Sequence, residues 1–384
     1  MGRPTCGTMG TFSPLIKDKI KEYRPGKEGW GAITIRVELE LAPDLSGEKI
    51  PSVSTINRHL KQRQRVRPYR MTIKLPGEAC IPSTGPHDVW QMDAEGNKQV
   101  KDVGTVSMIN IKDIFSKTYV QSYPLVLATK YNHPTGLNYQ RVLRLAFMEF
   151  GRCQKLQVDH ESVFYENTRP SPFPTRIHLW VLAMGAQLCH TPKGQPHKQG
   201  AVERKHQTMD RQVCQGRTYT DFDQLFAASQ KRRARLNYHI PCRMLDQRPP
   251  LQVYPKAKHS GRYYDPRKEQ ELFNQQLIFD YLAKCKWCRN VNDSKGVSLG
   301  ARYYTLKEAE PNSETKITFN LNTNRFRFCT PDDELITELD PKGLSFKELA
   351  GDLDTFIDWV ENNPLVIFRQ PPEENDDQKA DTTF

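Results

Sequence analysis

The sequence has no long hydrophobic run, and its cysteines form no regular framework. No stretch among the 384 residues approaches the ~18 apolar residues of a membrane-spanning helix, and the N-terminus lacks the apolar segment of a secretory signal. The nine cysteines are dispersed, and only Cys285 and Cys288 form a C-x-x-C pair. No second pair of ligands lies nearby, so the pattern favours free thiols in a reducing compartment over a structural zinc site.

Acidic residues are scarce outside the C-terminal part of the chain. Residues 330–384 carry 15 acidic and four basic side chains, although the whole chain has a net charge of +11, so the remaining residues carry +22. A body this basic indicates an extended polyanion as the partner, most simply DNA or RNA. Aromatic residues make up 10% of the sequence, which indicates a globular chain. The length allows roughly two to four domains.

Residues 1–75 predict a compact helical module. The segment after Trp30 alternates like a strand but also fits one helical face, and the residues that follow it favour the helix. Ser52 or Ser54 then supplies an N-cap for a helix that leads into a basic run. This pattern predicts a helix-turn-helix that contacts DNA phosphates, with an ordinary helical hairpin as the alternative. The candidate contact residues are Arg58, Lys61, Arg63, Arg65, Arg67 and Arg70.

The period of hydrophobicity changes after a Pro- and Gly-containing linker at residues 76–86. Three short strand-like segments are followed by an amphipathic helix that ends at Gly151, a strand, a helix, a last short strand and two further helices. This order of elements predicts a mixed α/β domain over residues 87–240.

The remaining segments differ from one another in composition. Residues 241–275 are basic and Pro-rich and predict a linker, whereas residues 276–341 alternate at period two and predict a small antiparallel β-barrel. Residues 342–384 predict one acidic amphipathic helix followed by a disordered tail. The predicted fold class is therefore multidomain α+β, with a helical N-terminal module, an α/β core, a small barrel and an acidic tail.

Three acidic residues occupy unusual positions. Asp93 lies in the middle of the apolar strand WQMDAEG, Asp159 closes the strand of LQVDHE, and Glu203 lies near the start of a helix after a Gly- and Pro-containing approach. Each has an ordinary explanation on its own, such as a turn cap, an ion pair with a neighbour or a contact within the helix. An acid in a core strand is costly unless it is paired or binds a metal, however. Together the three predict a site for Mg²⁺ or Mn²⁺.

These segments resemble the motifs of a known family. WQMDAEG, LQVDHESVF and GQPHKQGAVERKHQTM are similar, in this order, to the three acidic motifs of the retroviral-integrase-type DDE transposases of bacterial insertion sequences and transposons. The third motif is the most specific, because Gly and Val typically precede its Glu-Arg. The resemblance covers about residues 25–340 and implies an N-terminal helix-turn-helix, an RNase H-like catalytic core and a small C-terminal β-barrel.

The resemblance also implies an activity. Asp93, Asp159 and Glu203 would be the catalytic residues and would bind two Mg²⁺ (or Mn²⁺) ions, and the enzyme would expose 3′-OH ends at a transposon and join them to target DNA. The partners would be double-stranded DNA and further copies of the chain on DNA. The acidic tail would either contact an ATPase for target selection or act as a solubilising or self-masking segment. The location would be the cytoplasm, at the nucleoid, if the source is bacterial. Further basic residues expected near the DNA are Lys198, Arg204, Lys205, His206, Lys231, Arg232 and Arg233.

Two departures from the family pattern keep other functions open. His160 and Glu161 stand where the family has Asn-Gly, and Gln199 stands where it commonly has Asn. Glu161 adds a carboxylate that would compete for the metal or impair the enzyme. The alternative is therefore a catalytically impaired or domesticated transposase that acts as a sequence-specific DNA-binding protein. A third reading is an RNase H-like nuclease that cuts without joining.

Overall fold

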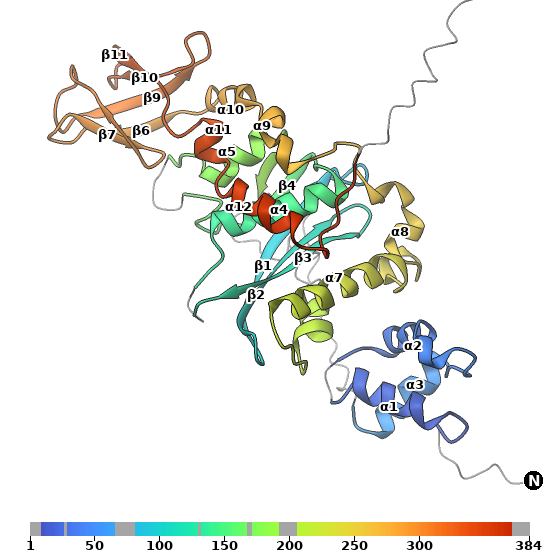
Figure 1. The fold of residues 1–384 in the computed structure, drawn as a ribbon. Coiled ribbons are helices and arrows are strands. Elements are labelled where there is room, and N and C mark those ends of the chain that lie inside the picture. The colour runs from blue at the N-terminus through green and yellow to red at the C-terminus, as the bar shows by residue number, and fades with distance from the viewer. Residues whose placement is uncertain are drawn as a thin grey trace, which may run out of the picture.

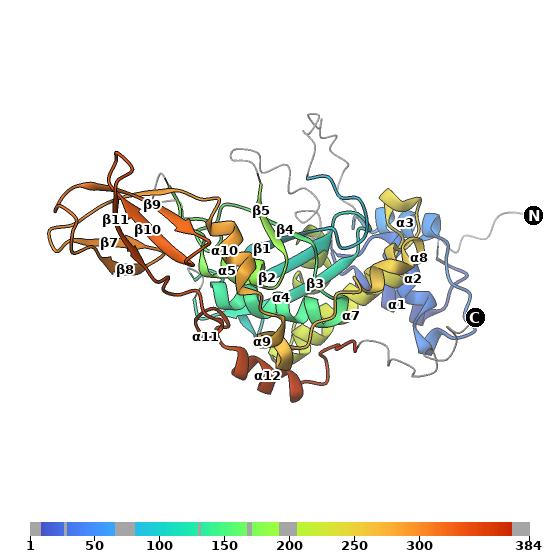
Figure 2. The same ribbon diagram turned by 90° about the horizontal axis from the view of Figure 1, so that it is seen from above.

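The computed structural model describes residues 9–26, 29–65, 81–129, 132–166, 171–191 and 206–370 (Figures 1 and 2). The chain begins with a helical module of three helices, α1 (Pro14–Tyr23), α2 (Ala32–Glu40) and α3 (Val53–Gln62), with a short 3₁₀ turn, η1 (Pro43–Leu45), between the last two. Within the described residues, no helix has both the length and the apolar character needed to cross a bilayer.

The ambiguous segment after Trp30 is helical. Ile35 and Leu39 are buried on one side of α2, whereas Ile33 is 42% exposed, and a strand would have placed all three on the same face. Ser52 is the N-cap of α3, and its hydroxyl accepts a hydrogen bond from the amide of Thr55 at 3.2 Å. The predicted helices are therefore present, whereas the helix-turn-helix assignment and DNA binding stay predictions.

The centre of the molecule is a five-stranded mixed sheet with the order β3-β2-β1-β4-β5. Its strands are β1 (Val89–Val100), β2 (Gly104–Asp113), β3 (Tyr119–Leu127), β4 (Lys155–Val158) and β5 (Gln187–His190). The first three pair antiparallel, and β1, β4 and β5 pair parallel. The crossovers of the parallel part are α4 (Gly136–Phe150) and α5 (Arg176–Ala183), and α7 (Phe222–Tyr238) packs on β3. This confirms the predicted mixed α/β core.

The helix α4 forms the centre of the largest apolar cluster. A capping box between Thr135 and Asn138 starts it, and Gly151 ends it with a φ of 71°. A side chain at Gly151 would overlap the Ser260 hydroxyl, so this position requires glycine for space as well as for backbone conformation. Phe147 of α4 packs between Trp90 of the sheet and Trp180 of α5, at centroid distances of 5.9 and 6.0 Å.

The segment predicted as a linker packs on this core. Residues 241–275 form short helical turns, and Tyr264 and Glu269 within them are buried. Glu269 accepts hydrogen bonds from Arg144 of α4, from Trp180 and from Tyr264. The turns are η4 (Arg243–Leu245), α8 (Pro250–Val253), η5 (Pro255–Lys258), η6 (Pro266–Lys268) and α9 (Glu269–Leu272). The prolines of this segment thus begin helical turns along the core.

A second β region follows α10 (Gln275–Leu282). Its strands are β6 (Trp287–Asn290), β7 (Gly296–Leu299), β8 (Arg302–Thr305), β9 (Glu314–Asn320), β10 (Arg325–Cys329) and β11 (Leu335–Leu339). They form a four-stranded antiparallel sheet, β11-β10-β9-β6, and a separate pair, β7-β8. Within residues 206–370, all of which the structure describes, the two edge strands β6 and β11 do not pair with each other. The predicted small antiparallel barrel is therefore not closed.

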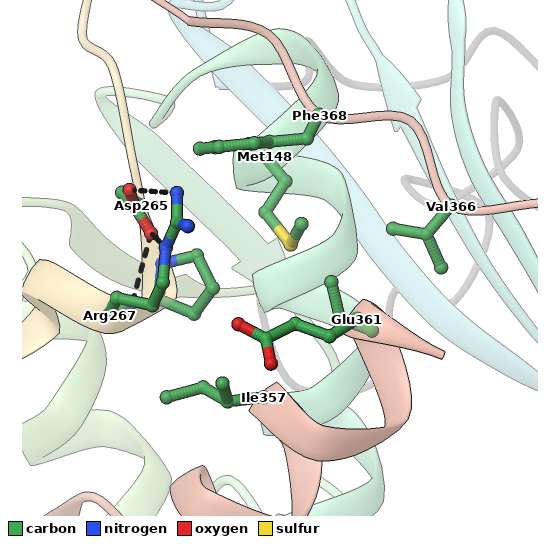
Figure 3. Close-up of a pocket in the computed structure, with 9 residues that line it drawn as sticks. Met148, Asp265, Arg267, Ile357, Glu361, Val366 and Phe368 are labelled. Atoms are coloured by element: carbon green, nitrogen blue, oxygen red, sulfur yellow. Dashed lines mark hydrogen bonds and ion pairs between the residues drawn. The ribbon is translucent and has the colours of Figure 1, made fainter. Parts of the chain in front are cut away.

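The acidic C-terminal helix packs against the core. Gly351, with a φ of 72°, divides it into α11 (Phe346–Leu349) and α12 (Leu353–Glu361). Phe356 of α12 is fully buried, and Arg141 of α4 lies over the Trp359 ring at 5.0 Å from its centroid. An apolar cavity of about 210 Å³ lies beside α12 and is lined by Met148, Ile357, Val360, Val366 and Phe368 among others. Figure 3 shows how Met148, Ile357, Val366 and Phe368 lie around it. The apolar face of α12 therefore faces the chain itself, and the predicted tail beyond residue 370 lies outside the described residues.

Candidate metal centre

Two of the three predicted carboxylates meet because of the register of the sheet. β1 and β4 are parallel, and Gln91 of β1 pairs with Gln157 of β4. Asp93 and Asp159 each lie two residues further along their strands. Their side chains therefore project at the same level and from the same face of the sheet. Asp93 sits within β1 opposite Asn110 of β2, and Asp159 is the first residue after β4.

Glu161 is the third carboxylate at this position. The Asp93, Asp159 and Glu161 carboxylates each offer an oxygen, and these atoms lie within 4.8 Å of one another. The amide of Glu161 donates a 2.9 Å hydrogen bond to Asp159 Oδ1, and the hydroxyl of Tyr139 donates a 2.9 Å hydrogen bond to Glu161 Oε2. The short turn after β4 and the Tyr139 side chain of α4 thus hold the Glu161 carboxylate close to the other two acids.

The three carboxylates repel one another in a half-buried place. Burial raises the pKa of Asp159, the amide of Glu161 opposes this, and the charge of Asp93 raises it further. Burial also raises the pKa of Glu161, and the charges of Asp159 and Asp93 add to the effect. Burial and the charge of Glu161 raise the pKa of Tyr139, which stays a hydrogen-bond donor. A divalent cation with hard oxygen ligands would relieve this repulsion, so the donor set fits Mg²⁺ or Mn²⁺.

His206 orients Asp93. The His206 Nε2–Asp93 Oδ2 distance is 3.1 Å, and the His206 Nδ1–Asn110 Nδ2 distance is 2.7 Å. Because a carboxylate only accepts, Nε2–H donates to Asp93, which leaves Nδ1 to accept from the Asn110 amide. The structure thus gives His206 a role in orienting Asp93, and its position near a DNA phosphate stays a prediction.

A half-buried group of ion pairs ties β1 to the helical segment that follows His206. Residues 206–209 are helical and continue as a π-helical segment, η3 (Asp210–Cys214). Lys98 of β1 lies 2.5 Å from Glu95 Oε1 and 2.6 Å from Asp210 Oδ1. Glu95, Lys98, Asn110 and Tyr139 were not predicted, because nothing in the sequence marks which residues of β1, β2 and α4 face Asp93.

The predicted basic residues divide into three groups. Arg58, Lys61, Arg63 and Lys231 are exposed, and Arg65 is half-buried, with its guanidinium bonded to the carbonyl of Arg24 at 2.7 Å. Arg232 and Arg233 are buried, and they pair with Glu38 at 3.1 Å and Glu149 at 2.5 Å. The prediction of DNA contact is corrected for these two, since their charges are used within the fold. The predicted residues that lie outside the described residues are Arg67, Arg70, Lys198, Glu203, Arg204 and Lys205.

The described residues contain no second cluster of potential metal ligands. The acidic group described above is the one cluster of at least three close His, Cys, Asp or Glu ligands in the part of the chain that the structure describes. Cys285 and Cys288 are both free thiols.

The comparisons with known proteins found solved structures of retroviral integrases at low similarity. No family model matches the sequence. The chain is similar to the HTLV-2 integrase catalytic core domain in complex with magnesium: the trimeric form is 14% identical with a TM-score of 0.33 and covers 45% of this chain and 99% of that one. The dimeric form is 12% identical, with a TM-score of 0.33, and covers 45% and 98%. A chain of the simian T-cell lymphotropic virus intasome in complex with PP2A regulatory subunit B56 gamma is 12% identical, with a TM-score of 0.35, and covers 81% and 100%.

Mg²⁺ is expected to raise the temperature of thermal unfolding at pH 7, by about 2–4 °C for each kcal/mol of binding free energy. The effect should shrink as the pH falls through the raised pKa values of Asp159 and Glu161, because protons then neutralise the ligands. Glu161→Gln should reduce the shift, whereas Asp102→Asn, in an exposed turn, should not. Differential scanning fluorimetry in EDTA and in Mg²⁺ measures it, and an equal shift in wild type and Glu161→Gln would remove Glu161 from the site.

Proposed function

We propose that the chain is a DNA transposase or integrase. It binds transposon ends, exposes 3′-OH ends by metal-dependent hydrolysis and joins those ends to target DNA by transesterification. The observation that carries this proposal is the meeting of Asp93 and Asp159, which are 66 positions apart, at neighbouring strands of one mixed sheet. The basic body of the chain supplies the second argument, because it suits a polyanionic substrate.

The catalytic group in this proposal is Asp93, Asp159 and Glu203. Two Mg²⁺ or Mn²⁺ ions held by these carboxylates would activate the attacking oxygen and stabilise the leaving oxygen. Both reaction steps are in-line displacements at phosphorus that need no protein nucleophile, so the residues of the chain act by positioning. His206 keeps the Asp93 carboxylate in one orientation, and Tyr139 does the same for Glu161.

The division of labour along the chain follows from this function. Residues 1–75 would recognise the transposon end, residues 87–240 would cut and join, and residues 276–341 would add DNA contacts. Residues 76–86 and 241–275 would connect them, with residues 342–384 as the acidic end. The exposed Arg58, Lys61 and Arg63 at the end of α3 suit contact with DNA phosphates. Several copies would act together on paired ends.

The position of Glu161 supports a second candidate function. Glu161 completes a group of three carboxylates without Glu203, and it stands where the resembled family has no acid. If it binds the cation in a geometry that does not support the reaction, the chain would be an impaired transposase that acts as a sequence-specific DNA-binding protein. The two candidates make opposite predictions for the purified wild-type protein.

Glu203→Gln is expected to lower the rates of strand cleavage and joining of end DNA in Mg²⁺ by a factor on the order of 10³. DNA binding should persist. The amide keeps the size of the side chain and removes its charge. Glu271→Gln, an exposed residue of α9, is the matched control and should react as wild type does. Equal strand transfer by wild type and Glu203→Gln would refute the catalytic assignment. A wild-type protein that binds end DNA but never cuts it would establish the second candidate.

A further inference from the structure

The helical N-terminal module lies against the core through one tryptophan. Trp30 Nε1 donates a 3.2 Å hydrogen bond to the carbonyl of Gln212 in η3, and the Arg232 guanidinium of α7 lies 3.9 Å from the centroid of the Trp30 ring. Arg232 also pairs with Glu38 of α2 at 3.1 Å. The place where α2, η3 and α7 meet is called the module–core junction below (Figure 1).

The module–core junction contains a cavity of about 400 Å³. Tyr23, Trp30 and Glu38 line it from the module, and Arg217, Lys231 and Arg235 are among the residues that line it from the core. A cavity of this size is in the range that holds a small ligand or a few groups of a larger one. Its position matters because η3 continues the helical residues 206–209, of which His206 contacts Asp93.

The cationic side chains of this cavity exceed the carboxylates that neutralise them. Four cations, Arg217, Lys231, Arg232 and Arg235, line it together with two carboxylates, Glu22 and Glu38. Glu38 accepts a hydrogen bond from Arg232, and Glu22 is exposed. The cavity therefore keeps a positive balance after its internal ion pair is counted.

Two of the four cations, Arg217 and Lys231, have no carboxylate within ion-pair distance among the described residues, and the pair that Arg235 forms with Glu38 is long. The guanidinium of Arg217 lies over the Trp30 ring at 5.0 Å and forms no ion pair there, and Lys231 is exposed without one. Arg235 Nε is buried and has no hydrogen-bond partner, with Glu38 Oε1 3.9 Å away. Burial lowers the pKa of Arg232, Glu38 opposes this, and the charges of Arg217 and Arg235 add to the lowering. A buried unpaired donor beside crowded cations is costly unless an anion binds.

We propose that the module–core junction binds phosphate groups of a DNA backbone, with Arg217, Lys231 and Arg235 as the donors. Arginine forks match phosphate oxygens in pairs, and a mobile lysine adds a point charge. The choice of DNA as the source of the phosphate rests on the proposed function. DNA held at the junction would contact the module and the core at once, on the side from which η3 leads to Asp93.

The test is a titration of a fluorescent duplex with the full chain over a range of salt concentrations. Arg217→Gln/Lys231→Gln is expected to lower the affinity about 10- to 100-fold at 0.1 M salt and to reduce the slope of log K against log salt by about 0.9 for each lost phosphate contact. Lys347→Gln, an exposed lysine of α11, removes a charge of the same kind elsewhere and should leave the slope unchanged. Arg217→Lys keeps the charge and should restore most of the affinity.

Several outcomes would overturn the proposal. An unchanged slope in the double variant and in the exposed single variant Lys231→Gln would show that no DNA phosphate binds there. Inorganic pyrophosphate separates the two sources of the anion: it should displace DNA in wild type, whereas binding of pyrophosphate at the junction without any effect on DNA would assign the cavity to a free anion instead. A failure of the proposed catalysis would leave the salt slope of DNA binding intact, so it is distinguishable from a failure of this proposal, which would leave the slope of the double variant equal to that of wild type.

Discussion

Asp159→Asn is expected to lower the rate of DNA strand cleavage by on the order of 10³-fold, about 4 kcal/mol of transition-state stabilisation. The amide fits the same space but loses the charge that a cation requires, at the point where β4 brings it beside Asp93 and Glu161. The measurement is the single-turnover rate of cleavage of end DNA in Mg²⁺, with affinity for DNA measured in parallel. A variant that cuts at the wild-type rate would refute the role of Asp159.

The same substitution is expected to raise stability when no divalent cation is present. The pKa of Asp159 is higher in the folded protein than its ordinary value of 3.8, so the folded state binds the proton more readily than the unfolded chain does. The charged group therefore costs stability, and this cost appears as the pH rises from about 3.8 through the raised pKa. Urea unfolding in EDTA should show Asp159→Asn above wild type at pH 7 and close to it at pH 3.5. A destabilised variant at pH 7 would contradict the described repulsion.

Glu269→Gln is expected to lower the free energy of unfolding by about 3–5 kcal/mol. Arg144 and Glu269 are both fully buried, and both nitrogens of the Arg144 fork donate to the Glu269 carboxylate at 2.8 Å. Tyr264 and Trp180 donate to the same carboxylate, so the glutamine amide would face donors with a donor of its own. The buried guanidinium would lose its counter-charge within the core.

The matched control is a pair of the same kind on the surface. Arg325 and Asp340 lie 2.8 Å apart with side chains 48% and 78% exposed, and Asp340→Asn should change stability by no more than ~1 kcal/mol. Urea unfolding of both variants in the full chain measures the contrast. Equal losses in the two would mean that Glu269 is no more important than an exposed partner.

The sequence predicted the core because its signals there are local. The strands, α4 and its end at Gly151 follow from periodicity and from a residue that tolerates positive φ. The positions of Asp93 and Asp159 were also predictable, since each interrupts or closes an apolar strand. Their approach depends on the β1–β4 register, which is a long-range property that a pattern of residues does not specify.

Other features needed the structure because charge alone does not reveal burial. Arg232 and Arg233 belong to a basic run that reads as a DNA-facing surface, yet each occupies a buried ion pair with a glutamate far away in the sequence. The Pro-rich segment 241–275 reads as a linker because the partners of its buried Glu269 include Arg144 of α4 and Trp180 of α5, which lie far away in the sequence. The two edge strands of the C-terminal sheet alternate at period two, as barrel strands do. This pattern does not determine whether the two strands pair with each other.

Because α12 packs on α4, the apolar surface of α4 is covered only late in synthesis. Arg144 donates a 2.5 Å hydrogen bond to the carbonyl of Ala350, and Phe356 fills the space beside it. Helix α4 therefore keeps an apolar surface without its cover until more than 200 further residues have left the ribosome. An apolar surface left open during that interval is prone to aggregation.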